Sequence, residues 1–197
     1  MSARIAEILM ESGVMVGKFV QSKTVQATIS HIAHEVVSIL KNSGQVLICG
    51  NGGSAADAQH MAAEMTGTFR IKTRRPLPVF ALTTNTSHIT AVGNDFGFKD
   101  IFSRLIHAHC VSYQQETLLI AISTSGNSEN IIEALKAAKT YGATTVGLTG
   151  QTGGKMKELC DFLIQVPSDD TPRIQECHLI AEHAICDLVE QAMFSEN

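Results

Sequence analysis

Apolar residues recur at helical spacing in the first part of the chain. They stand three or four residues apart, or at sums of these steps, and this pattern predicts two successive amphipathic helices. The first helix is marked by Ile5, Ile8, Leu9, Val16 and Phe19, and the second by Ile29, Ile32, Ala33, Val36, Val37 and Leu40. Asn42-Ser43-Gly44 predicts the end of the second helix. We therefore expect a helical pair over residues 1–44, with apolar faces suited to a subunit interface.

Short apolar runs alternate with helical patterns along the rest of the chain. Strands that are apolar on both faces and separated by helices indicate a parallel sheet covered on each side. The expected fold is a doubly wound, three-layer α/β sandwich with a five-stranded, mostly parallel sheet behind the N-terminal helical pair. No repeat or Pro-rich linker marks a boundary, so residues 1–197 are expected to form one domain. The expected strands are 45–49, 78–82, 117–122, 144–149 and 161–166, and the expected helices are 55–66, 87–92, 128–141, a short one after 154, and 171–193.

Composition and charge narrow the class of protein. The chain is 44% hydrophobic and 17% charged, which is typical of a compact globular protein. Its formal charge is −4 and its densest basic stretch, 72–75, is short, so nucleic-acid binding is not expected. No signal sequence and no apolar run of about 20 residues is found, so no membrane association is expected. Five cysteines without a C-x-x-C pair indicate a reducing, cytoplasmic location.

A glycine-rich loop follows the first predicted strand. Gly50 to Ala55 matches the dinucleotide-binding pattern G-x-G-x-x-A, but no acidic residue follows about 20 positions later, as that site requires. A Walker A loop is excluded because no Lys-Ser or Lys-Thr follows the glycines. Asn51 and Ser54 add side-chain donors to the backbone N–H groups at a helix N-terminus, which suits sugar hydroxyls or an anion. The alternative is a turn that only lets the helix pack on the sheet.

A second polar turn, Ser123-Thr124-Ser125-Gly126-Asn127-Ser128, follows the third predicted strand. Hydroxyl groups and helix N-terminal N–H groups together provide the converging donors that a phosphate needs. The turn contains no Lys or Arg, which favours a single phosphate on a small molecule. Helix capping is the alternative, but three serines and a threonine exceed what capping requires.

Two predicted helices carry groups suited to acid–base chemistry. His60 and Glu64 are four residues apart and share a helix face. Gln175 and His183 are eight apart, about 80° around the last helix. The four side chains would suit a borderline metal ion, or the proton transfers of an aldose–ketose isomerase. For each histidine the alternative is a packed or surface residue.

These segments resemble the phosphoheptose isomerase family of the sugar-isomerase (SIS) superfamily. The resemblance extends in order over nearly the whole chain. It rests on Leu47 to His60, Glu64, Val92 to Gly97, Ser123 to Ser128 and Arg173 to Glu176. It implies conversion of sedoheptulose 7-phosphate to D-glycero-D-manno-heptose 7-phosphate through an enediol. That reaction is the first step of the ADP-heptose route to lipopolysaccharide core. The resemblance also implies that the protein is a cytoplasmic homotetramer.

The resemblance also implies roles for particular residues. Glu64 would be the base at C1 and C2, and His183 the acid–base partner at the oxygens. One zinc per subunit would be held by His60, Glu64, Gln175 and His183. Substrate would be bound by Asn51, Gly52, Gly53, Ser54, Glu64, Asn94, Asp95, Ser123, Thr124, Ser125, Ser128 and Gln175.

Two other kinds of protein share features of this sequence. Replication-initiator-associating proteins of the same superfamily act by binding a partner, but they tend to lack counterparts of Glu64 and His183. A sugar-phosphate sensor of a transcription regulator would need a DNA-binding module, and residues 1–44 are too apolar for one. Some family members carry Asp directly before the residue that matches Arg173, where this chain has Pro172, so a role for Asp169 or Asp170 stays open.

Overall fold

The computed structural model describes residues 1–113 and 116–195, with the side chains of 112 and 113 left aside. The strands are β1 (Gln45–Gly50), β2 (Val79–Ala81), β3 (Thr117–Ile122), β4 (Thr144–Thr149) and β5 (Phe162–Gln165). The helices are α1 (Ser2–Gln21), α2 (Lys23–Lys41), α3 (Gly53–Thr66), α4 (Thr86–Asp95), α5 (Ile101–Tyr113), α6 (Glu129–Thr140) and α7 (Thr171–Phe194), with 3₁₀ helices η1 (Phe98–Asp100) and η2 (Gly154–Glu158).

The five strands form a single sheet in the order β2-β1-β3-β4-β5, and all four neighbouring pairs are parallel. The predicted fold class is confirmed, and the sheet proves parallel throughout the described residues. From β1 the chain passes to β2 on one side and then crosses back to β3 on the other side of β1. The strand order therefore reverses between β1 and β3. Ligands of such sheets bind beyond the carboxyl ends of the strands at this switch point. The glycine loop and the serine turn follow these two strands.

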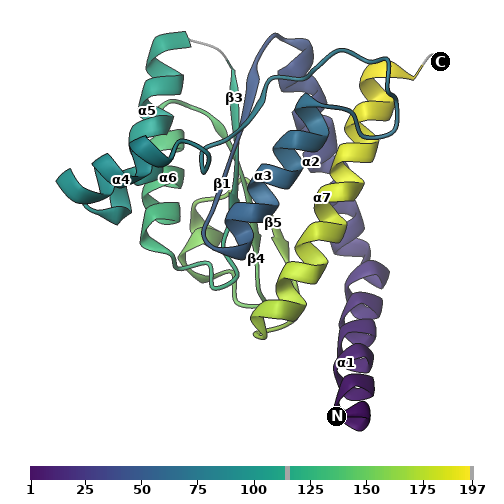
Figure 1. Ribbon diagram of the computed structural model, residues 1–197. Coiled ribbons are helices and arrows are strands. Elements are labelled where there is room, and N and C mark those ends of the chain that lie inside the picture. The colour runs from purple at the N-terminus through teal and green to yellow at the C-terminus, as the bar shows by residue number, and fades with distance from the viewer. Residues whose placement is uncertain (114–115, 196–197) are drawn as a thin grey trace.

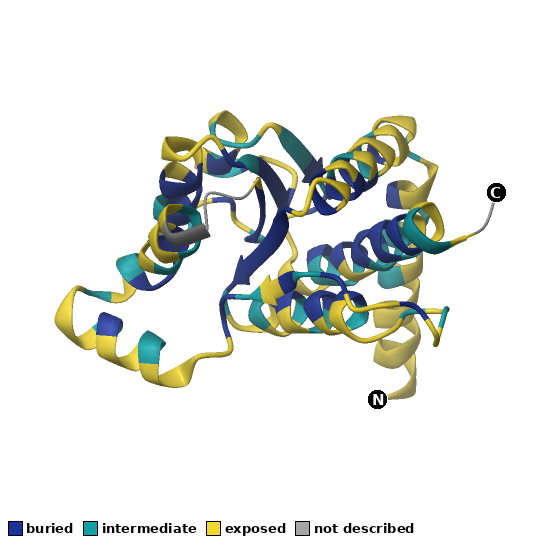
Figure 2. Cartoon of the chain, turned by 90° about the horizontal axis from the view of Figure 1, so that it is seen from above, coloured by how far each residue is buried: buried dark blue, intermediate teal, exposed yellow. Residues whose placement is uncertain are grey.

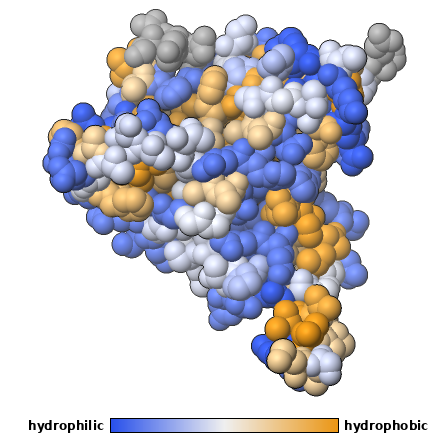
Figure 3. Space-filling model, in the orientation of Figure 1, coloured by the Kyte–Doolittle hydropathy of each residue, from blue (hydrophilic) through white to orange (hydrophobic). Residues whose placement is uncertain are grey.

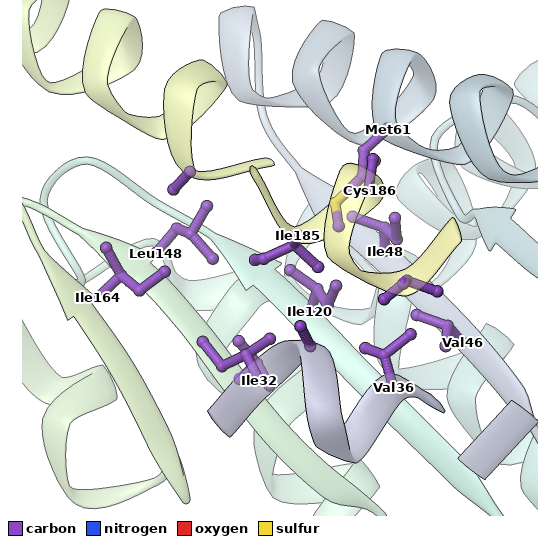
Figure 4. Close-up of a cluster of buried hydrophobic side chains, with 14 of the residues drawn as sticks. Ile32, Val36, Val46, Ile48, Met61, Ile120, Leu148, Ile164, Ile185 and Cys186 are labelled. Atoms are coloured by element: carbon purple, nitrogen blue, oxygen red, sulfur yellow. The ribbon is translucent and has the colours of Figure 1, made fainter. Parts of the chain in front are cut away.

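Helices cover both faces of the sheet (Figures 1 and 2). Alternate residues of each strand point to opposite faces. Ile48 and Ile120 enter the core beneath α2, α3 and α7 (Figure 4), whereas Leu47 and Leu119 enter the core beneath α5 and α6. Both cores are apolar and buried, which explains why the strand sequences do not alternate in polarity.

Helix α5 is not among the predicted elements. Its buried residues Ile101, Phe102 and Ile106 do have helical spacing, but polar residues and histidines are interleaved with them. Strand β2, at the edge of the sheet, is shorter than the predicted 78–82. The other elements lie within a few residues of their predicted bounds.

The two N-terminal helices differ in their surroundings. Helix α2 packs on the sheet and contributes Ile32, Val36 and Leu40 to the core. Helix α1 extends away from the body (Figure 1), and Phe19 is its one buried residue. That residues 1–44 lie at a subunit interface stays a prediction. Within this segment, α1 is the helix that we expect to form the interface.

Candidate active site

The glycine loop and the serine turn are joined by a pair of side-chain amides. Asn51, directly after β1, donates to Asn130 Oδ1 at 2.8 Å, and Asn130 donates back to Asn51 Oδ1 at 2.8 Å. Asn130 lies in the first turn of α6 and is 3% exposed. The predicted donor Asn51 therefore fixes one loop against the other. Asn130 was not predicted, although a polar residue two positions after the serine turn was a visible signal.

Backbone geometry explains the glycines between β1 and α3. A Cβ atom on Gly50 would lie 2.3 Å from the Ser54 carbonyl oxygen, so the close approach of strand and helix requires glycine. Gly52 has a φ of 57°, and the space around its missing Cβ is open. Ser54 is only 3% exposed and packs against Gly50. The loop thus leaves the backbone at Gly52 open to a ligand, while Ser54 is packed beneath it.

The serine turn is closed by its own backbone and opens onto the N-terminus of α6. Gly126 N–H donates to the Ser123 carbonyl at 3.0 Å. Ser128 is the N-cap residue of α6, yet its side chain makes no capping hydrogen bond; its Oγ lies 3.1 Å from Ser123 Oγ. Capping therefore does not explain Ser128. The first-turn N–H groups of α6 carry the positive end of the helix dipole, so they favour an anion here.

The structure brings together three of the predicted acid–base residues. His60 Nε2 and His183 Nε2 lie 2.8 Å apart, and the rings meet edge to face at 5.0 Å between centroids. Glu64 Oε1 lies 3.8 Å from His60 Nε2. All three side chains are partly exposed. This juxtaposition joins α3 to α7 and creates a two-imidazole, one-carboxylate cluster.

Gln175 lies elsewhere on the same helix. Its Nε2 atom would be 2.4 Å from a Cβ atom on Gly53, so the amide lies against the N-terminus of α3 rather than in a recorded contact with His60. Among residues 1–113 and 116–195, no three His, Cys, Asp or Glu side chains are arranged so that they could hold a metal ion. The donors at His60, Glu64 and His183 are nevertheless of the type that zinc prefers.

The remaining predicted residues are farther apart. Asn94 donates to Asp95 Oδ1 at 2.8 Å, and both are exposed at the end of α4, which extends from the body of the molecule (Figures 1 and 2). Asp170 is the N-cap residue of α7, with its carboxylate 4.0 Å from Arg173 Nε, and Asp169 is exposed. The structure therefore gives Asp170 a place at the helix start.

The carboxyl groups of Glu182 and Asp57 lie near the cluster of His60, Glu64 and His183, and some of their oxygens accept no hydrogen bond from the described residues. Both oxygens of Glu182 and Oδ2 of Asp57 are buried and have no partner among the described residues. Burial, and then the charge of Asp57, raise the pKa of Glu182 to about 8. Burial also raises the pKa of Asp57. Glu182 is thus mainly uncharged at neutral pH, because burial disfavours the charged form of a carboxyl group.

His178 is a packed residue, which is one of the alternatives given for each histidine. It is fully buried, and its Nε2 atom lies 3.3 Å from the Thr149 carbonyl oxygen. Burial lowers its pKa to about 4, against a smaller opposing effect of that hydrogen bond. His178 is therefore a packed, neutral residue.

Taken together, fold and site define a class of protein: a parallel α/β domain with a serine-rich turn at its switch point and a cluster of two imidazoles and one carboxylate between α3 and α7, typical of sugar-phosphate enzymes. Residues 18–150 match the model of the SIS domain family. Phosphoheptose isomerase of Aliarcobacter butzleri is 52% identical over 87% of this chain and 88% of its own. That of Rhodospirillum rubrum is 53% identical over 85% of this chain and 87% of its own. The chain belongs to the phosphoheptose isomerase family of SIS-domain proteins, and it is a phosphosugar isomerase, an intramolecular oxidoreductase.

Solved structures agree with this assignment. Phosphoheptose isomerase GmhA of Neisseria gonorrhoeae superposes with a TM-score of 0.85 at 42% identity, covering 95% of this chain and 98% of its own. The enzyme of Francisella tularensis gives 0.89 at 35% identity, covering 97% and 99%. None of the helices in the described part of the chain has the length and apolar character to cross a membrane.

Proposed function

We propose that this protein converts sedoheptulose 7-phosphate to D-glycero-D-manno-heptose 7-phosphate. The observation that carries the proposal is the cluster of His60, Glu64 and His183 between α3 and α7, in a chain about half identical to phosphoheptose isomerases. The product would enter the ADP-heptose route to lipopolysaccharide core, in the cytoplasm.

The acid–base cluster supplies the groups that such an isomerisation needs. Glu64 would remove a proton from C1 of the ketose, giving a 1,2-enediol, and return it to C2. His183 would move the matching proton between the oxygens at C1 and C2. Hydrogen is transferred within one molecule, so no external oxidant or reductant is consumed. A positioned base and acid of this kind contribute about 10²–10⁴-fold each to rate.

Substrate would lie across the switch point. Its phosphate would be bound by Ser123, Thr124, Ser125 and Ser128 with the N-terminus of α6. Its hydroxyls would meet the backbone at Gly52 and Gly53, with Asn51 and Gln175 beside them. Asn94 and Asp95 are proposed substrate contacts too, although α4 carries them outward from this chain's own body.

Zinc is proposed as the cofactor, one ion per subunit. Two imidazole nitrogens that already converge, with a carboxylate oxygen at 3.8 Å from one of them, match the ligand types of zinc sites. Glu64 and Gln175 would have to turn toward the imidazoles to complete the set with His60 and His183. When bound, zinc would act as a Lewis acid toward substrate oxygens.

A homotetramer is the proposed assembly. Helix α1 exposes Ile5, Leu9, Met10 and Val14, each with more than half of its surface accessible. Apolar side chains gather on this projecting helix (Figure 3). An exposed apolar face of this kind is typical of a protein interface.

Purified protein incubated with sedoheptulose 7-phosphate tests the proposal. We expect formation of the aldose 7-phosphate, and loss of activity with a chelator that is reversed by added zinc. Glu64→Gln should lower kcat by about 10²–10⁴-fold while substrate still binds.

Glu133→Gln is a suitable control, because Glu133 is a solvent-facing carboxylate on α6 paired with Lys136. It should leave kcat unchanged. Substrate binding by the wild type without turnover would contradict the proposal and favour a partner-binding protein. Full activity of zinc-free protein would contradict the cofactor role alone.

A further inference from the structure

The segment between α3 and β2 is attached to α7 by one buried carboxylate. Glu190, 2% exposed, accepts hydrogen bonds from the backbone N–H groups of Phe69 at 3.0 Å, Arg70 at 2.6 Å and Ile71 at 3.0 Å. It also accepts a hydrogen bond from Arg74 Nε. Four donors on one buried carboxylate fix the path of residues 69–74 against α7.

The Arg74 guanidinium uses its other donors on the end of α3. Nη2 donates to the Glu64 carbonyl at 2.6 Å, and Nη1 donates to the Met65 carbonyl at 2.9 Å. The last carbonyl groups of a helix have no partner within the helix, and a cation is favoured there. Arg74 therefore holds the backbone of Glu64 itself, and its side chain is only 1% exposed.

The same segment touches His183. The Phe69 ring lies 5.8 Å from the His183 ring, centroid to centroid, and is tilted by 40°. Next to it, Arg70 forms an ion pair with Asp187 at 3.1 Å. His183, Asp187 and Glu190 are spaced by four and three residues, so they share one stripe of α7. The segment thus lies along α7 from Glu190 to His183.

We infer that Arg74 and Glu190 are positioning residues of the active site: through residues 69–71 and the carbonyl of Glu64, they set the placement of the Glu64 backbone and of the His183 ring. The inference rests on the proposed roles of Glu64 and His183. None of the three linking residues, Phe69, Arg74 and Glu190, needs to contact substrate for this role.

The first variant to test is Arg74→Lys. Lysine keeps the positive charge beside Glu190, but a single ammonium cannot reproduce the planar fork that reaches Glu190, Glu64 and Met65 together. Misplacement of catalytic groups by about 1 Å costs about 100-fold in rate. We expect kcat to fall at least tenfold, with KM changed less than threefold.

Phe69→Leu is the second variant, and it leaves the Arg74–Glu190 pair in place. It removes the ring that lies against His183, so we expect a smaller fall in kcat with little change in melting temperature. Phe102→Leu is the matched control, because Phe102 is buried in the core on the opposite face of the sheet. It should lower melting temperature while kcat of the folded protein is unchanged.

A readout independent of turnover is the ring resonance of His183 in ¹⁵N-histidine-labelled protein, assigned with His183→Gln. Arg74→Lys should shift or broaden it, while the resonance of His107, bonded to Tyr141 on the other face, stays in place. An unchanged His183 resonance together with wild-type kcat in Arg74→Lys would overturn the inference. If the wild type does not isomerise sedoheptulose 7-phosphate, the proposed function fails, and the resonance alone then decides the positioning role.

Discussion

Two glutamates on α7, eight residues apart, show how surroundings set the charge of a buried carboxyl group. Burial would by itself raise the pKa of Glu190, but hydrogen bonds from Arg74 and from Arg70, Phe69 and Ile71 lower it to about 2. Glu182 has no recorded hydrogen-bond donor, and its pKa is raised to about 8. Glu190 is therefore charged and organises a loop, whereas Glu182 is packed as a neutral acid.

The lowered pKa of Glu190 predicts an acid-dependent loss of stability. A carboxyl group whose pKa falls from an ordinary 4.5 to about 2 on folding stabilises the folded protein at pH values above 4.5. For this pKa difference the contribution to the free energy of unfolding is about 3 kcal/mol. That stabilisation is lost as pH falls from 4.5 toward 2. Glu190→Gln should therefore be less stable than wild type at pH 7, and the difference should narrow below pH 4.5.

Urea unfolding at several pH values and one fixed protein concentration measures this difference. Glu133→Gln serves as the control, because its carboxylate is partly exposed and pairs with the exposed Lys136, so its stability should parallel wild type at every pH. A constant difference between wild type and Glu190→Gln from pH 7 to pH 3 would show that the carboxylate is not stabilised by its donors.

Ser125 is predicted to contribute binding energy rather than rate. Its hydroxyl accepts a hydrogen bond from the Asn127 N–H group at 3.2 Å and is exposed at the tip of the turn. A phosphate contact is made equally in the ground state and the transition state, so its removal raises KM and leaves kcat nearly unchanged. We expect Ser125→Ala to raise KM about threefold to tenfold, as one net hydrogen bond implies, whereas Ser38→Ala on exposed α2 surface leaves both constants unchanged. A fall in kcat alone would contradict this role.

At the scale of elements, the serine turn depends on a close contact with the loop before η2. A Cβ atom on Gly126 would lie 2.2 Å from the Gly153 carbonyl oxygen, and the Gly126 φ of 66° disfavours other residues. The Gly126 carbonyl also accepts the Met156 N–H at 3.1 Å. Two loops that follow β3 and β4 are thereby packed backbone to backbone, which fixes the shape of the proposed phosphate site.

Comparison of two glycines separates backbone strain from this contact. Gly142 has a φ of 71° with open space around its missing Cβ, so Gly142→Ala should cost about 1 kcal/mol from conformation alone. Gly126→Ala adds a clash with backbone and should cost at least about 1 kcal/mol more. It should also raise KM, which Gly142→Ala should not. Equal losses of unfolding free energy in the two variants would show that the turn can move away without cost.

How far the sequence predicts these elements depends on whether the signal is local. Thr117–Ile122 and Thr144–Thr149 have the predicted strand bounds, because buried apolar runs flanked by polar turns leave little freedom. His60 and Glu64 were found through helical spacing. The pairing of Arg74 with Glu190 spans 116 residues and has no periodic signal, so only the folded chain reveals it. For the same reason the resemblance points to Gln175 on the last helix, but the position of its amide against Gly53 appears only in the folded chain.

At the scale of the whole molecule, α1 is a helix whose apolar residues one chain leaves largely exposed. Its last turns pack through Phe19, and nearer its N-terminus Ser12 donates to Glu176 at 2.7 Å and Arg173 donates to the Ile8 carbonyl at 3.0 Å. These contacts hold α1 beside the start of α7, where Gln175 lies. An assembly that covers α1 would therefore also restrict the N-terminal turn of α7.

A single charge on this helix tests whether its apolar residues bind further copies of the chain. Leu9 is 67% exposed, so Leu9→Glu removes apolar contact area between subunits without disturbing the core of one chain. We expect light scattering coupled to size exclusion to show a tetramer for wild type and a smaller species for Leu9→Glu, with unchanged circular dichroism. Gln21→Glu, an equal change of charge at an exposed polar position of α1, should remain tetrameric. Because burying a charge at a subunit interface is strongly unfavourable, an intact Leu9→Glu tetramer would mean that this face of α1 stays in solvent in the assembly.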